Sequence, residues 1–257
     1  MVNQQAGTRP YADPVRIVPL RVAAAPPAPA QPPHLTYRNG PLLASVEVVT
    51  IFWGAAWEGS PHSDEAARLN QFFDTILVSS LMDALAEYSV PGTTIGHGTR
   101  IGSVTFTASD PGSTVSDAAI QSLLQDNAVS GGALPAPTPN TLYFVYVPPG
   151  TTVTTSDGTS CSTFCGYHDA TPSRLFYAVM PYPDCTGCLG GMSIFDALTV
   201  SSSHELCEAV TDAVPGTGWY DDANGEIGDI CAWKTATIDG FTVQQEWSNS
   251  QNACISP

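Results

Sequence analysis

The pattern of hydrophobic and polar residues changes its period several times after residue 42. Three short runs, 46–53, 141–147 and 175–180, are almost wholly apolar and rich in β-branched or aromatic residues, which is typical of strands buried on both faces. Residues 101–107 instead alternate apolar and small polar side chains, and this period of two predicts a half-buried strand. A closing strand is expected at about 241–247.

Apolar residues spaced three and four apart predict three amphipathic helices between these strands. The longest should run from Ser63 to Tyr88, and a shorter one should extend from the capping residues Ser116 and Asp117 to Leu124. The third should begin at Met192. Because strands and helices alternate, the expected fold class is α/β, with a mixed β-sheet packed with helices in a single domain.

Residues 1–40 have a different composition. The run 22–33 alternates Ala and Pro without any apolar period, so it should form extended chain rather than a packed element. We therefore expect a Pro/Ala-rich leader or linker at 1–40, which could also be the remnant of a pro-segment, and one folded domain at 41–257. The apolar core of a signal peptide is not found in this segment, so the signal of a secreted protein is expected to have been removed.

Charge and hydropathy exclude two classes of partner. Eight basic residues stand against twenty-four acidic ones, a formal net charge of −16, and a surface of this sign repels phosphate backbones. Apolar runs stay well short of the roughly 18 residues that a membrane span needs. We expect no nucleic-acid partner and no membrane span.

The seven cysteines favour an oxidising, extracellular compartment. An odd number leaves one thiol over, and Cys207 is our candidate because it lies inside a helical motif, where a small buried thiol packs well. An alternative is a four-thiolate zinc site formed by the CSTFC and CTGC segments. The candidates for disulfide bonding are Cys161, Cys165, Cys185, Cys188, Cys231 and Cys254.

The segment SSSHELCEAVTDA, residues 201–213, holds the strongest candidate site. On a helix, residues four apart share one face, so His204 and Glu208 project side by side, while Glu205 lies about 100° further round. A histidine and a carboxylate form two-thirds of a typical catalytic zinc site, which has three protein ligands and an open position. Glu205 is then placed as the general base of the related H-E-x-x-H metallopeptidases. A surface or core helix with an ordinary His–Glu pair is the alternative interpretation.

A third ligand is expected from the acidic turn GEIGD, residues 225–229. Glu226 and Asp229 follow Glu208 by 18 and 21 residues. We rank Glu226 first because the flanking glycines would let it turn back toward the helix, and we expect Asp229 to bind or to orient the ligands. His168, in GYHD, is a further candidate ligand.

The ligand set and the reaction leave several alternatives open. A histidine with two carboxylates is harder and more anionic than two histidines with one carboxylate, so zinc is the first choice and calcium, supported by the oxygen-rich run 221–229, is a structural alternative. His168 or Tyr220 could donate a hydrogen bond to a developing oxyanion. A serine nucleophile at Ser193 is disfavoured because GGMSIF lacks the second glycine of a nucleophile elbow.

Four segments together resemble one known family. They are YRNGPLLASVEVVTIFWG, TLYFVYVPPGTTV with FCGYHD, SSSHELCEAVTD, and EIGDIC with Trp247 and Cys254. The chain resembles the EXORDIUM, or phosphate-induced protein, family over residues 37–254, although Cys207 stands where alanine is common and the glycine-rich insert of plant members is missing. The resemblance implies an extracellular location, a zincin-like fold and an association with cell wall or glycan.

These observations lead to two hypotheses of different classes. The first is a secreted zinc-dependent endopeptidase acting on a peptide or protein substrate, with the HExxE motif on a central helix and Glu205 taking a proton from metal-bound water. The second is a non-catalytic extracellular EXORDIUM-like protein that keeps a structural ion and binds a glycan or protein partner.

Overall fold

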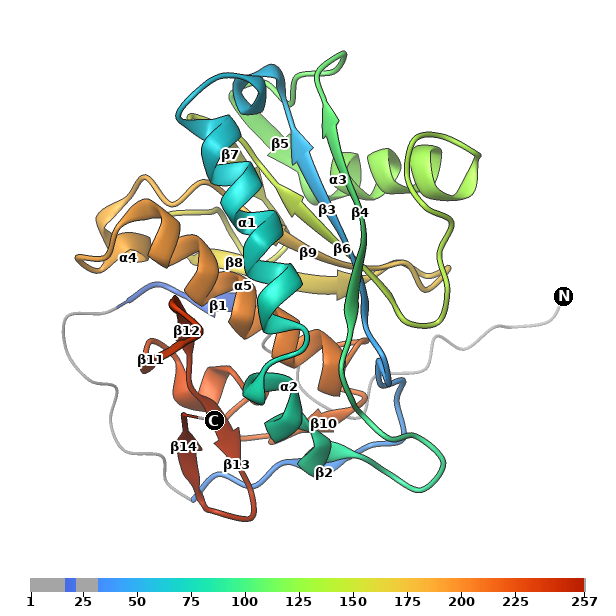
Figure 1. Ribbon diagram of the computed structural model, residues 1–257, viewed down its shortest axis with the longest axis vertical. Coiled ribbons are helices and arrows are strands. Elements are labelled where there is room, and N and C mark those ends of the chain that lie inside the picture. Colours follow the sequence, from blue (N-terminus) through green and yellow to red (C-terminus); the bar gives the residue numbers. More distant parts are fainter. Residues whose placement is uncertain (1–16, 22–31, 257) are drawn as a thin grey trace, which may run out of the picture.

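The computed structural model describes residues 17–21 and 32–256 and is built around a six-stranded mixed sheet (Figure 1). The strand order is β1-β8-β9-β6-β3-β4. Four strands run parallel to one another, β8 is antiparallel to β9, and β1 is antiparallel to β8. The strands are β1 (Ile17–Pro19), β3 (Glu47–Trp53), β4 (Thr99–Phe106), β6 (Thr141–Tyr146), β8 (Phe164–Ala170) and β9 (Phe176–Met180). The predicted α/β class with a mixed sheet is confirmed.

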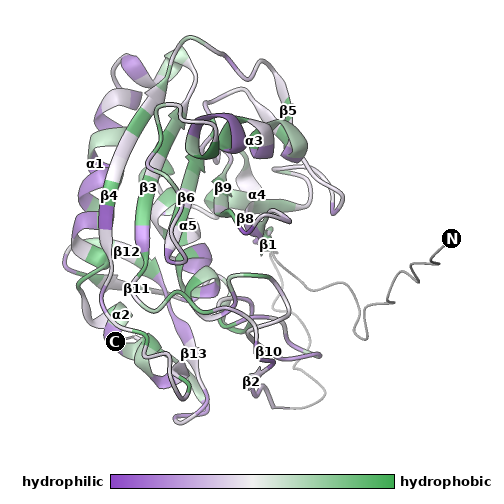
Figure 2. Ribbon diagram, turned by 90° about the vertical axis from the view of Figure 1, so that its right-hand side faces the viewer, coloured by the Kyte–Doolittle hydropathy of each residue, from purple (hydrophilic) through white to green (hydrophobic). Residues whose placement is uncertain are grey.

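Helices cover both faces of this sheet, as Figure 2 shows for α1 and α3. One hydrophobic core joins the sheet to α1 (His62–Ile76), α2 (Ser80–Leu85) and α5 (Ile194–Thr211), and a second core joins the opposite face to α3 (Asp117–Leu124). The shorter helical elements are η1 (Ala55–Glu58), η2 (Ala86–Tyr88), η3 (Gln125–Val129), α4 (Thr186–Leu189) and η4 (Asp229–Cys231).

Four two-stranded ladders complete the fold. They are β2 (Thr36–Tyr37) with β10 (Trp219–Tyr220), β5 (Thr114–Ser116) with β7 (Thr152–Thr154), β11 (Thr235–Ile238) with β12 (Phe241–Gln244), and β13 (Glu246–Ser248) with β14 (Ala253–Ile255). Strand β12 packs on α5. Within the expected leader at 1–40, β1 and β2 take part in the fold, whereas most of the Ala/Pro run lies outside the described residues.

The predicted elements differ from the structure in three places. The single helix expected from Ser63 to Tyr88 is divided, because the Ser79 hydroxyl donates to Ile76 O and accepts from Leu81 N, which ends one helix and caps the next. The closing strand is split into β12 and β13 at Gln245. Strand β8 lies where we expected a cysteine-bearing loop, since the glycine and the aspartate within it have low strand propensity.

Three disulfide bonds join six of the cysteines. Cys161 bonds Cys185, Cys165 bonds Cys188, and Cys231 bonds Cys254. The alternative four-thiolate zinc site is excluded, because its four sulfurs are paired with one another. Cys207 is free and buried on α5, as predicted.

Within the part of the chain that the structure describes, no helix combines the length and the apolarity that a membrane crossing requires.

Candidate metal centre

The HExxE motif lies on α5, a helix enclosed by other elements on nearly every side. The Ser193 hydroxyl caps its first turn by accepting from Asp196 N. From Ala197 to Thr211 every residue is buried, because β8 and β9 contact the helix from the sheet and β12 contacts it from outside. The helix predicted from the motif is therefore confirmed, and its charged side chains project into the interior of the protein.

His204 and Glu208 meet as their spacing predicted. His204 Nε2 lies 2.9 Å from Glu208 Oε1, and both side chains have zero exposure. The nitrogen nevertheless has no hydrogen-bond partner of acceptable geometry. The two atoms therefore lie close enough to bind one cation together.

Gln244, on β12, fixes the orientation of the His204 ring. Its Oε1 accepts from His204 Nδ1 (3.1 Å) and from the backbone N–H of Trp233 (3.1 Å), while its Nε2 donates to Gly228 O (2.9 Å). These bonds hold the proton of His204 on Nδ1 and leave Nε2 free to act as a ligand. Sequence reasoning missed Gln244, because a single glutamine inside a strand gives no signal of its own.

The turn 225–229 packs directly on the motif. Asp229 N donates to Glu208 Oε1 (3.1 Å), and Glu226 N donates to Asp229 Oδ2 (3.0 Å). A Cβ atom on Gly228 would lie 2.9 Å from both Glu208 Oε1 and the His204 ring, so only glycine allows the turn to approach so closely. The expected contact between the acidic turn and the helix is present.

His168 reaches the same interior from β8. Its Nδ1 donates to Glu205 Oε2 (2.9 Å), and its Nε2 donates to Asp212 O (3.2 Å) and lies 3.6 Å from Glu226 Oε1. The side chain is 1% exposed. A histidine that the sequence offered as one of several candidates thus lies in contact with Glu205 and close to the candidate ligands.

The candidate ligands form two groups that share Glu208. In the first, ligand atoms of His204, Glu208 and Asp229 lie within 4.8 Å of one another; in the second, those of His168, Glu208 and Glu226 do so. Our sequence ranking put Glu226 beside His204. The structure instead brings Asp229 into the group with His204, and it brings Glu226 into the group with His168.

Several buried oxygens in this cluster receive no hydrogen bond. They are Glu205 Oε1, Glu208 Oε2 and both carboxylate oxygens of Glu226. Burying a carboxylate without a donor or a counter-ion is costly. Together with the unpaired His204 Nε2, these atoms form a nitrogen and oxygen donor set of the kind that zinc takes, so the residues present fit a divalent cation.

Burial and charge act in opposite directions on several pKa values in the centre. Burial raises the pKa of Glu226 and of Asp229 well above the usual range, and the charge of Glu208 adds to both shifts. Burial would also raise the pKa of Glu208, but the charge of His204 and the His168 ring, 3.5 Å from Glu208 Oε2, lower it to about 2. Burial alone would lower the pKa of His168, whereas the hydrogen bond with Glu205 and the nearby Glu208 carboxylate raise it to about 10.

Two further buried carboxyl groups border the centre and were not among the predicted site residues. Asp212 accepts hydrogen bonds from the backbone N–H groups of Gly216 (2.6 Å), Thr217 (3.0 Å) and Gly218 (2.5 Å). Glu246 lies beside Cys207, and burial raises the pKa of both groups. Asp212 stands within the motif segment, so its position one turn after Glu208 was the available signal.

Other candidates have different surroundings. Tyr220 lies on β10 with the Arg38 guanidinium 4.5 Å over its ring, and neither group of three includes it. In the run considered for calcium, Asp221 accepts bonds from backbone N–H groups of His34 and Ala223, and Asp222 pairs with Arg38. Ser193 caps α5.

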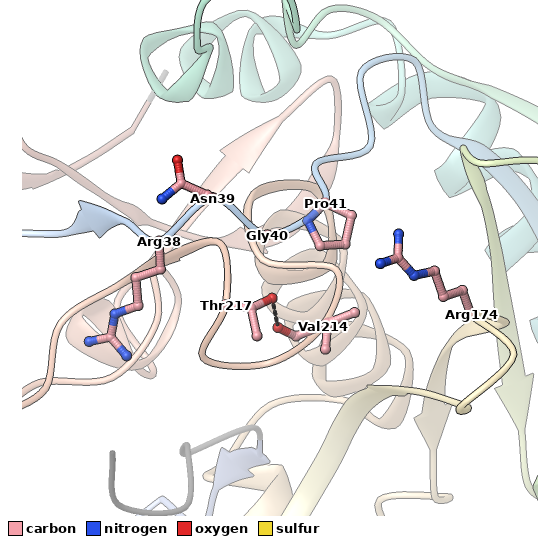
Figure 3. Close-up of a pocket in the computed structure, with 7 residues that line it drawn as sticks. All are labelled: Arg38, Asn39, Gly40, Pro41, Arg174, Val214 and Thr217. Carbon is pink, nitrogen blue, oxygen red and sulfur yellow. Dashed lines mark hydrogen bonds between the residues drawn. The ribbon is translucent and has the colours of Figure 1, made fainter. Parts of the chain in front are cut away.

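A separate cavity of about 410 Å³ lies beside the turn at Gly40 and Pro41. Figure 3 shows Arg38 and Arg174 on opposite sides of this turn. The complete lining is Arg38, Asn39, Gly40, Pro41, Arg174, Val214 and Thr217. None of these residues is a candidate ligand, so the cavity is distinct from the centre.

Comparison with models of protein families finds no match, and comparison with curated proteins finds none either. A match among solved structures is described as the structure of a chaperone-substrate complex, with 14% sequence identity and a TM-score of 0.33. It covers 61% of this chain and 26% of that chain. A likeness at this level carries no argument about fold or function, and the EXORDIUM resemblance stays a prediction.

Proposed function

We propose that this protein is a zinc-dependent peptidase whose metal ligands are His204, Glu208 and Asp229. The observation that carries the proposal is the 2.9 Å approach of His204 Nε2 to Glu208 Oε1, both fully buried, with a carboxylate oxygen of Asp229 in the same group. Three ligands from histidine and carboxylate side chains are typical of catalytic zinc sites, which keep a further position for water.

Glu205 has the properties that a general base needs. Its Oε2 accepts from His168, and its Oε1 receives no hydrogen bond, so one oxygen is available to take a proton. Burial raises its pKa despite the opposing bond from His168, and a carboxylate with a raised pKa is a better base near neutral pH. Zinc, when bound, would supply the acidified water and would polarise a carbonyl.

The wider features support an extracellular, zincin-like protein. The mixed sheet packs against the helix that carries HExxE, as expected of a zincin-like arrangement. Three disulfides are typical of oxidising compartments. Membership of the EXORDIUM family belongs to the same proposal, and it rests on the four matching segments.

Metal analysis of the purified protein, combined with a peptidase assay on casein, tests the proposal. We expect bound zinc in the native protein and in Glu205→Gln, but casein hydrolysis only in the native protein, with a loss of at least about 100-fold in Glu205→Gln. Glu58→Gln, which makes the same change at an exposed residue of η1, should keep full activity. Metal-free native protein would refute the proposal.

A second candidate function is favoured by the burial of most side chains of the centre. His204, Glu205, Glu208 and Glu226 all have zero exposure, which suits an ion that holds the fold together rather than one that meets a substrate. In that case the protein binds a glycan or protein partner without catalysis. It predicts that casein is not cleaved and that a chelator lowers the melting temperature.

A further inference from the structure

We propose that the cavity beside Gly40 and Pro41 binds a small organic carboxylate, with Arg174 as the residue that recognises the anion. The cavity has a volume of about 410 Å³, which is within the usual range of small-molecule sites. None of the residues that line it is a proposed zinc ligand. The inference therefore adds a second binding site and does not depend on the proposed function.

Arg174 carries a charge that the protein leaves unpaired. Among the arginine and lysine side chains of residues 17–21 and 32–256, it alone makes no hydrogen bond, ion pair or ring contact. The engaged side chains, each with its partner, are Arg21 with Gly190, Arg38 with Asp222, Arg68 with Phe195, Arg100 with Asp74 and Lys234 with Cys254. All five N–H donors of the Arg174 guanidinium are therefore available to an anion.

The fold fixes the direction of Arg174. Its guanidinium extends toward Pro41, across the cavity from its own loop (Figure 3). The residue stands in the turn 171–175 between β8 and β9 with a left-handed backbone, φ 61°, which is uncommon for arginine. Arg174 N donates to Thr171 O (2.8 Å), and Leu175 N donates to Thr171 Oγ1 (3.0 Å). These bonds hold the turn, so the base of the Arg174 side chain is set before any ligand arrives.

The opposite wall of the cavity is equally fixed. Gly40 N donates to Thr217 O (2.6 Å), and the Tyr37 hydroxyl donates to Gly40 O (2.7 Å). A Cβ atom on Gly40 would collide with Thr217, so the turn 39–41 lies directly on the segment that follows α5. Because both walls are built by the fold, a ligand would bind without the cost of ordering them.

The charges around the cavity select the kind of anion. Its lining includes two arginines and no acidic residue, in a chain with twenty-four acidic and eight basic residues. Arg38 is paired with Asp222 at 2.7 Å, so the charge of Arg174 is the one left to balance. A guanidinium donates two parallel hydrogen bonds to a carboxylate. Ligands with many negative charges would be repelled by the net charge of −16.

The rest of the lining describes the remainder of the ligand. Pro41 and Val214 supply apolar surface beside Arg174. The lining has no carboxylate that could accept from an ammonium group, so a free amine would be bound without a partner. The matching ligand therefore joins one carboxylate to an apolar body and carries no amine. An N-acylated apolar amino acid, such as acetyl-leucine, has this chemistry.

Titration of the full chain with acetyl-leucine tests the inference, with binding followed by saturation-transfer NMR at low salt. We expect saturable binding to the native protein and an affinity at least about 10-fold lower for Arg174→Gln, because a charge-assisted pair is lost. Arg100→Gln removes an arginine that is paired with Asp74 outside the cavity, and it should bind as the native protein does. No saturable binding to native protein, or native affinity in Arg174→Gln, would overturn the inference.

A second measurement needs no variant, so it does not depend on the folding of Arg174→Gln. Acetyl-leucinamide has the same apolar body as acetyl-leucine but no charge. It should bind the native protein at least about 10-fold more weakly. Equal affinity for the acid and the amide would show that Arg174 does not recognise a carboxylate, and it would remove the inference.

Discussion

Among the single residues of the centre, Gly228 is one at which the surrounding atoms leave no space for a side chain. It lets the turn 225–229 lie against the His204 ring and the Glu208 carboxylate, with no room for a side chain between them. The same close approach lets Gly228 O accept from Gln244, which orients His204. A position with no chemistry of its own therefore controls the geometry of two proposed ligands.

We expect Gly228→Ala to weaken zinc binding by at least about 10-fold, since displaced ligand supports typically cost 10 to 100-fold in metal affinity. Competition with a chromophoric zinc chelator measures the effect. Gly96→Ala is the matched control, because a Cβ there would meet nothing within 4 Å. Equal zinc affinity in the two variants would show that the turn does not position the ligands.

Cys207 should be inert in the folded protein. It has zero exposure, and burial together with the charge of Glu246 raises the pKa of its thiol, so the reactive thiolate is scarce. Ellman's reagent should find no reactive thiol in the native protein and one per chain after unfolding without reductant. A thiol that reacts at once in native protein would contradict the packing of α5.

At the scale of elements, the stability of α5 depends on the N-cap of its first turn. Ser193 accepts from Asp196 N at 3.1 Å and donates to Asp196 Oδ2 at 2.6 Å. Ser193→Ala should lower the free energy of unfolding by about 1 kcal/mol, the usual cost of a lost N-cap, while zinc binding persists. Urea denaturation measures the change. Full stability with abolished hydrolysis would instead identify Ser193 as a nucleophile.

Strand β1 is the second element whose role can be measured. Val18 has zero exposure and lies beside Gly166, whose missing side chain leaves room for it, and Trp233 Nε1 donates to Pro19 O at 2.9 Å. Val18→Asp should release the edge of β8, seen as faster hydrogen exchange of its backbone amides. Val78→Asp makes the same change at a residue that is 55% exposed, and it should leave β8 protected.

At the scale of the whole molecule, removal of metal should make stability depend on pH. The pKa of His168 is about 10 in the metal-free fold and 6.5 in the unfolded chain. A raised folded pKa contributes stability that is complete below 6.5 and is lost as pH rises toward 10. The raised pKa values of Glu226 and Asp229 also make stability fall as pH rises.

We therefore expect the free energy of unfolding in the presence of a chelator to fall between pH 6.5 and pH 10. Saturating zinc should flatten this dependence over the range in which zinc stays bound, because the ion replaces the protons that stabilise the cluster. Urea titrations at each pH provide the measurement. A flat profile without metal, or the same slope with zinc, would contradict this account of the cluster.

The sequence predicted the main elements because their signals are local. The apolar runs behind β3, β6 and β9 and the alternation behind β4 reflect burial on both faces or on one face, and the spacing of His204 and Glu208 fixes their common helical face. It missed β8, because glycine and aspartate within FCGYHDA have low strand propensity. It also missed β11, although Asp239 and Gly240 between β11 and the predicted β12 are a hairpin signal.

The sequence by itself determined the α/β class, the helix that carries HExxE and the free thiol at Cys207. The class and the helix follow from the periodicity of neighbouring residues. The free thiol follows from the odd number of cysteines and from the position of Cys207 inside the helical motif. Only the tertiary structure decided the pairing of the six other cysteines, the supporting role of Gln244, and the division of the acidic turn, with Asp229 beside His204 and Glu226 beside His168. These contacts join residues more than twenty positions apart, and only the packing of strands and turns around α5 sets the distances between them.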